Sequence, residues 1–213
     1  MSPPLPQQRE LVAGNTFDKY GSHNPIHRRL MRRFLADASQ LVSLARPTRV
    51  LEVGCGSGEL AAVLFRRETV SYQGVDLSPE EVARAQAVQP RWKFQVASAY
   101  DLPYHDGQFD FVVACEILEH VDDPQRAVDE MARVCSGHLL VSVPWEPIWR
   151  LANLARGAYL RQLGNTPGHL QHFSRGAIRA LVHRRFHLVQ ERRPFPWTML
   201  LARSRPTPEP TSP

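Results

Sequence analysis

Cysteine pairs and long apolar runs are missing from this sequence, and each absence excludes a class of protein. The three cysteines, at positions 55, 115 and 135, are far apart and form no C-x-x-C pair. Neither a disulfide framework nor a zinc knuckle is therefore expected. No stretch reaches the roughly 18 apolar residues of a membrane span, and the first residues lack the basic start and apolar core of a signal peptide. We expect a soluble, cytoplasmic protein without a transmembrane segment.

Acidic residues are scarce in the last third of the chain. Between positions 146 and 205 only Glu146 and Glu191 are acidic, against eleven arginines. Such a basic segment could meet nucleic acid, an anionic membrane surface or an acidic substrate. Because no aromatic residues alternate with the arginines as they would in a stacking platform, the sequence favours a solvated arginine-rich face.

The order of apolar and polar segments predicts one α/β domain in which helices and strands alternate. Residues 1–11 and 204–213 are rich in Pro, Ser and Thr and are expected to be disordered tails. The predicted helices cover residues 25–44, 59 onward, 79–88, 124–134, 147–164 and 174–185. The predicted strands cover residues 49–53, 71–76, 92–97, 109–114, 138–143, 186–192 and 197–203.

A glycine-rich turn follows the first predicted strand and is the most informative segment of the chain. It begins with Glu52 and continues with Gly54, Gly56 and Gly58, and Asp76 ends the second strand, where a ribose diol would lie. Alternate glycines permit positive φ and let the backbone approach a ligand closely. The spacing differs from the G-x-G-x-x-G of a dinucleotide site, and no Lys-Ser or Lys-Thr pair is present for a phosphate cradle. The pairing with Asp76 favours a nucleoside site over a turn without a ligand.

Together with the segment from Leu102 to Asp110, these residues resemble the class I S-adenosylmethionine (SAM) dependent methyltransferases. The resemblance runs from about Val50 to Pro144. It implies a Rossmann-like fold with helices on both faces of a seven-stranded, mostly parallel sheet, in the order 3-2-1-4-5-7-6 with the last strand antiparallel. It also implies a single domain over residues 1–213, in which residues 12–46 supply a lid and helix and residues 146–173 an inserted helix and loop on the acceptor side.

The same resemblance implies contacts for the cofactor, SAM. Glu52 and the backbone of the glycine turn would hold its methionine end, Asp76 would accept hydrogen bonds from the ribose hydroxyls, and Leu77 would pack on adenine. Relatives often have Asp after the third strand, whereas this chain has Ser98, whose hydroxyl can still accept a hydrogen bond with weaker discrimination of adenine. The other implied contacts are the backbone of Ala99, the backbone of Cys115, and Tyr20 of the lid.

Two segments offer groups that could move a proton or hold a metal. Glu116, Glu119 and His120 follow the fourth strand and would share one face of a helical turn, while His169 and His172 lie in a later loop. E-x-x-E-H with a later His resembles the metal-binding arrangement of the ubiquinone-biosynthesis O-methyltransferases and the small-RNA 2′-O-methyltransferases. That resemblance implies a divalent cation on these residues. Alternatively, the carboxylates pair with His or Arg and shape the pocket wall, which leaves His120, His169 or His172 as a general base.

These features favour a SAM-dependent methyltransferase that acts on a small organic acceptor, at oxygen. The apolar, aromatic segment after the fifth strand, with Trp145, Trp149 and Tyr159, could cover such an acceptor. Two alternatives stay open. The arginine excess and the E-x-x-E-H motif would suit an RNA 2′-O-methyltransferase, and Ser98 in place of Asp would suit a SAM-binding partner subunit without catalysis.

Overall fold

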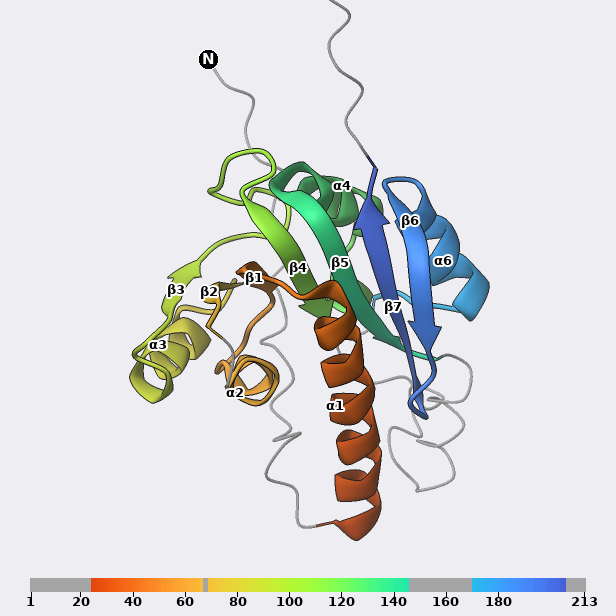
Figure 1. Ribbon diagram of the computed structural model, residues 1–213, viewed down its shortest axis with the longest axis horizontal. Helices are drawn as coiled ribbons and strands as arrows, with labels where there is room; N and C mark the ends of the chain where they lie inside the picture. Colours follow the sequence, from red (N-terminus) through yellow and green to blue (C-terminus); the bar gives the residue numbers. More distant parts are fainter. Residues whose placement is uncertain (1–23, 67–68, 146–169, 206–213) are drawn as a thin grey trace, which may run out of the picture.

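The computed structural model describes residues 24–66, 69–145 and 170–205, which build a sheet of seven strands with helices on both faces (Figure 1). The helices are α1 (Pro25–Ala45), α2 (Glu59–Leu64), α3 (Pro79–Val88), α4 (Pro124–Val134) and α6 (Arg175–His183), with a 3₁₀ turn η1 (Leu118–His120). The strands are β1 (Arg49–Val53), β2 (Ser71–Asp76), β3 (Lys93–Val96), β4 (Phe109–Cys115), β5 (Cys135–Pro144), β6 (Phe186–Arg192) and β7 (Trp197–Ser204).

The strand order is β3-β2-β1-β4-β5-β7-β6, which confirms the predicted topology. Strands β1 to β5 run parallel, and β7 is antiparallel to both β5 and β6. The carboxyl ends of β1, β2 and β4 therefore meet at one edge of the sheet, where ligands of open α/β sheets bind. Because β7 is reversed, its first residue, Trp197, pairs with Pro144 at the end of β5 and lies at this same edge.

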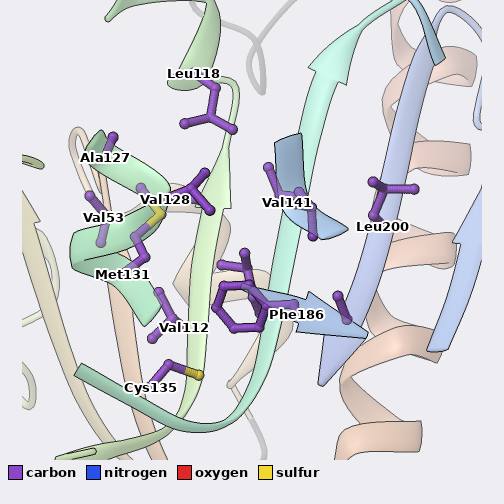
Figure 2. Packing of buried hydrophobic residues seen from close by; sticks show 14 of the residues in the cluster. Val53, Val112, Leu118, Ala127, Val128, Met131, Cys135, Val141, Phe186 and Leu200 are labelled. Carbon is purple, nitrogen blue, oxygen red and sulfur yellow. The ribbon is translucent and has the colours of Figure 1, made fainter. Parts of the chain in front are cut away.

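Alternate residues of the central strands enter two hydrophobic cores on opposite faces of the sheet, as expected for strands buried on both faces. In β4, Phe111 and Val113 pack with α1 and α2, whereas Val112 and Ala114 pack with α4 and α6. Figure 2 shows the second core, where Val128 and Met131 of α4 approach Val112. The sheet is thus covered on both faces, so its edge is left to carry the site.

Local sequence explains where the helices begin. Asn24, Ser78, Asp123 and Ser174 each accept a backbone N–H of the following turn, as helix N-caps do. Proline occupies the first position of α1, α3 and α4, where its missing N–H costs nothing. These signals are contained in the sequence, and the predicted helix starts agree with the structure to within one residue.

Several predicted boundaries are wrong by one or more residues; α6, for example, ends at His183 rather than Arg185. Strand β3 is shorter than residues 92–97, β5 begins at Cys135 rather than His138, and Ser204 belongs to β7 rather than to a tail. The predicted helix 147–164, residues 1–23, the loop to residue 169 and the tail from 206 lie outside the described residues. Within the described ranges, no helix combines the length and the apolar character needed to cross a membrane.

Candidate functional site

The glycine turn lies where β1 ends and is tied to the end of β2. The backbone N–H groups of Gly54 and Cys55 both donate to the Val75 carbonyl, at 2.8 and 3.0 Å. Gly54, Gly56 and Gly58 have φ of 74°, 49° and 77°, a region that favours glycine. All three glycines thus adopt the positive φ that alternate glycines permit.

Two of these glycines serve different purposes. A Cβ on Gly54 would lie 2.1 Å from Cγ2 of Ile117, so this glycine lets the loop after β4 pack against the turn. A Cβ on Gly56 would meet no atom within 4 Å, so this glycine faces open space. The turn is thus closed toward the protein at Gly54 and open at Gly56, as a backbone cradle for a ligand requires.

Asp76 links the cradle to the end of β2. Its half-buried carboxylate accepts the N–H of Gly56 at 2.8 Å and the N–H of Ser78 at 2.9 Å. Each carboxylate oxygen can accept more than one hydrogen bond, so these bonds fix the group without exhausting it. Leu77 follows with 37 % of its surface exposed, which leaves an apolar face beside the carboxylate. A carboxylate and an apolar face beside an open glycine suit a nucleoside.

Glu52 lies beneath the turn rather than on its surface. Only 3 % of it is exposed, and it accepts the Tyr72 O–H at 2.6 Å. Burial raises the pKa of Glu52 to about 8; the Tyr72 hydrogen bond opposes this rise, and the negative charge of Asp76 adds to it. Glu52 is therefore a protonated group at neutral pH in the ligand-free chain, bonded to a tyrosine that the sequence analysis did not include.

The segment after β3 completes this side of the site. Ala97 N–H donates to the Asp76 carbonyl at 3.0 Å, which places Ser98 and Ala99 next to the end of β2. Ser98 Oγ accepts the N–H of Tyr100 at 3.2 Å, so the hydroxyl closes a local turn. The predicted adenine contacts are therefore brought to the same edge as Asp76.

Glu116 follows β4 in a left-handed conformation, with φ of 61°, which is uncommon for a residue other than glycine. Its carboxylate accepts Ser142 Oγ–H at 3.1 Å and the indole N–H of Trp197 at 2.7 Å. The expectation of one helical turn through residues 116–120 is wrong, because the 3₁₀ turn begins only at Leu118. Donors from β5 and β7 hold Glu116 out of that turn, so Glu116, Glu119 and His120 do not share a helical face.

Of the other candidate acid and base residues, Glu119, His120 and His172 are described by the structure. Glu119 is 2 % exposed, and its carbonyl accepts the N–H groups of Leu170 and Gln171, at 2.8 and 3.1 Å. This pairing brings the end of the later loop, with the exposed His172, next to η1. His120 is partly exposed. His169 and Tyr20 lie outside the described residues.

A metal site is not assembled in the part of the chain that the structure describes. No three His, Cys, Asp or Glu side chains gather there as a metal centre would require. Burial raises the pKa of the Cys115 thiol above its ordinary value, so this thiol stays protonated at neutral pH. The backbone of Cys115 nevertheless lies at the predicted place, at the end of β4 beside β1.

Four residues that hold the site were missed by the sequence analysis: Tyr72, Ile117, Ser142 and Trp197. Ser142 is the single polar residue within the apolar run 139–144 of β5, which is a signal that could have been used. Trp197 donates to a residue 81 positions earlier, so no local pattern identifies it.

Comparison with known proteins agrees with this geometry. Residues 25–187 match a family described as methyltransferase domain. The chain belongs to this family, since the match covers well over half of its 213 residues.

Two curated relatives match only in part. The chain is 37 % identical over 97 residues to norajmaline N-methyltransferase of Rauvolfia serpentina, covering 43 % of this chain and 33 % of the relative. It is 36 % identical over 104 residues to tocopherol O-methyltransferase, chloroplastic, of Arabidopsis thaliana, covering 46 % of this chain and 30 % of the relative. The matches thus span about a third of these relatives' length, and they include both N- and O-methyltransferases.

Solved structures confirm the class I methyltransferase fold. Magnesium protoporphyrin IX methyltransferase from Synechocystis PCC 6803, solved with bound S-adenosylhomocysteine (SAH), superposes with a TM-score of 0.67 at 18 % identity, covering 87 % of this chain and 90 % of that one. The [4+2]-cyclase SpnF superposes equally well, with a TM-score of 0.67 at 20 % identity over 89 % of this chain and 85 % of that one. Since one of these two proteins is named a cyclase, the fold alone does not fix the reaction.

Proposed function

We propose that this protein transfers a methyl group from SAM to a small organic acceptor, at an oxygen atom. The observation that carries the proposal is the bond between Gly56 and Asp76, which joins an open backbone cradle to a carboxylate at the carboxyl edge of the sheet. When bound, SAM supplies an electrophilic methyl group on a sulfonium. Gly56 and the neighbouring turn would hold the methionine end, Asp76 the ribose, and Leu77, Ser98 and Ala99 the adenine.

The acceptor would approach from the side of Glu116 and η1. Methyl transfer is a displacement at carbon, so placing the acceptor close and excluding water can supply much of the rate. An alcohol or phenol must also lose its proton. His120 and His172 are the described candidates for this base, with His169 from the same loop as His172. The tocopherol O-methyltransferase match supports oxygen as the acceptor atom, and the norajmaline match makes nitrogen the competing outcome.

Calorimetric titration with SAH tests the cofactor site. We expect binding with one site per chain. Absence of any nucleoside binding would contradict the proposal. Repeating the titration after chelation, and then with added Mg²⁺, Mn²⁺ or Zn²⁺, tests whether a cation takes part. Metal uptake that is lost in a Glu119→Ala variant would assign that role to the E-x-x-E-H motif.

Turnover separates the acceptor classes. The protein would be incubated with radiolabelled SAM and matched panels of phenols, catechols, secondary amines and short RNA. Methylation of the phenols or catechols would support O-methylation of a small acceptor. Methylation of the amines or of the RNA instead would contradict the proposed oxygen acceptor and identify the true acceptor class. SAH binding without turnover on any panel would favour a SAM-binding partner subunit without catalysis.

A further inference from the structure

The first half of α1 carries an arginine cluster that the fold does not explain. Arg28, Arg29, Arg32 and Arg33 are all exposed, and none of them forms an ion pair with a carboxylate of the described residues. Most other arginines with short contacts in this chain serve the fold, as Arg133 does with Glu130 at 2.7 Å. The arginine cluster of α1 thus carries four positive charges that no ion pair among the described residues balances.

The spacing of the arginine cluster opposes helix formation. Arg28 and Arg32, and likewise Arg29 and Arg33, are four residues apart on one helix, an arrangement in which like charges repel. The first turn of α1 contains no acidic residue, although acidic residues stabilise a helix N-terminus. A local arrangement that disfavours the helix and forms no ion pair in the described part of the chain is typical of a functional surface.

The arginine cluster lies beside the proposed acceptor side. Phe34, one residue after it, contacts the ring of Trp197 edge-on with centroids 5.2 Å apart, and Trp197 donates to Glu116. Figure 1 shows that the N-terminal half of α1 continues past the edge at which β4 and β5 end. The arginine cluster therefore projects from the same edge of the sheet as the site.

Exposed apolar side chains accompany the arginine cluster. Ile26 is 70 % exposed and lies on the same helix face as Arg29 and Arg33, at spacings of three and seven residues. Arg33 lines a shallow groove together with Phe195, which is 48 % exposed, and with Asp37 and Arg193. Arg193 pairs with Glu191 at 2.6 Å, but Arg179 pairs with the same carboxylate, so this neighbouring group keeps a net positive charge beside that of α1.

We propose that this surface docks on an anionic lipid bilayer, so that the acceptor side faces the membrane. Guanidinium groups bind lipid phosphates, and protruding apolar side chains enter the boundary between headgroups and acyl chains. A site for single-stranded RNA would instead place several aromatic side chains beside the arginines for base stacking. In the described part of this surface, only Phe195 is such an exposed aromatic residue. The inference rests on the proposed methyl transfer, because docking would serve to take a lipid-soluble acceptor from the bilayer.

Cosedimentation with vesicles tests the docking without any use of activity. The full chain would be mixed with vesicles of equal parts phosphatidylglycerol and phosphatidylcholine, and separately with pure phosphatidylcholine. We expect binding to the anionic vesicles that weakens as salt rises. Arg29→Gln with Arg33→Gln should lower the partition constant about 30-fold, since each arginine near an anionic surface contributes about a fivefold change. Ile26→Ser should weaken binding further in the same assay.

A matched control removes the same charge elsewhere. Arg46→Gln with Arg203→Gln lowers the net charge by the same amount at the opposite edge of the sheet, where α1 and β7 end, and should leave vesicle binding nearly unchanged. Equal losses in both variants, or no anionic vesicle binding by the wild type, would overturn the proposal. Tight, salt-sensitive binding to single-stranded RNA that displaces the protein from vesicles would also overturn it. SAH calorimetry on the same variants should be unaffected, so failure of the docking is distinguishable from failure of the cofactor site.

Discussion

Trp197 donates its indole N–H to Glu116 at 2.7 Å and thereby joins the first residue of β7 to the loop after β4. The bond exists because β7 runs antiparallel to its neighbours, which places its beginning at the edge where the parallel strands end. Trp197 is 5 % exposed and also contacts Phe34 of α1. One side chain therefore connects the helix that carries the arginine cluster, the last strand and the acceptor side of the site.

Trp197→Phe should destabilise the protein by about 1–3 kcal/mol, because it keeps an aromatic ring against Phe34 but deprives the Glu116 carboxylate of a donor. Urea unfolding measures the change. Trp92→Phe is the control, since Trp92 is similarly buried and has no hydrogen bond to a buried carboxylate among the contacts of the described residues. A loss no larger in Trp197→Phe than in the control would show that the bond to Glu116 contributes little.

Alanine at two positions of the glycine turn should separate folding from ligand binding. Gly54→Ala places a Cβ 2.1 Å from Ile117 and should destabilise the protein strongly. Gly56→Ala meets no atom, so we expect only the backbone cost of a positive φ, about 1–2 kcal/mol, while the added methyl group fills the cradle and abolishes SAH binding. Thermal unfolding and calorimetry with SAH measure the two effects. Full SAH affinity in Gly56→Ala would place the ligand elsewhere.

The buried Glu52 should make stability depend on pH. Its pKa is about 8 in the folded chain and near 4.5 in the unfolded one, so between these values only the folded state holds the proton. Unfolding then releases a proton, and stability falls as pH rises from about 4.5 to about 8, by about 3–5 kcal/mol in total, before it levels off. Urea unfolding at a series of pH values measures this fall.

Glu52→Gln is the diagnostic variant for that pH dependence. The amide oxygen can still accept the Tyr72 O–H, but the group cannot ionise, so the fall in stability should disappear and the variant should be more stable than wild type at pH 8. Glu80→Gln is the control. Glu80 is exposed, and a hydrogen bond from Ser78 lowers its pKa, so above about pH 6 it is ionised in both states and contributes nothing to the fall there. A fall that persists unchanged in Glu52→Gln would assign the pH dependence to another group.

The sequence predicted the helices and strands around the site better than the side-chain contacts within it. Caps such as Ser78 and the alternate glycines act within a few residues, so β1, β2, α3 and α4 were predicted with their observed bounds or first residues. Glu116 shows the limit of such local reasoning. Its partners Ser142 and Trp197 are 26 and 81 residues away, and their hydrogen bonds override the helical turn that the local spacing favours. The glycine turn has a local sequence signal and was predictable, although Val75 and Asp76 hold it in place, whereas the acceptor side has no such signal and is built by tertiary contacts.

Asp76 provides the most direct test of the cofactor site. Asp76→Asn keeps one acceptor oxygen but replaces the other by an amide that donates, so the bond to Gly56 or to Ser78 is lost, together with the negative charge offered to the ribose. Because a hydrogen bond to a charged group contributes about 1.5–3 kcal/mol, we expect SAH affinity to fall by about 10- to 150-fold. Calorimetry measures the affinity. Asp106→Asn is the control, since Asp106 is an exposed partner of Arg133 away from the site, and it should change SAH affinity by less than about twofold. Equal effects in the two variants would mean that Asp76 supports the fold and does not contact the ligand.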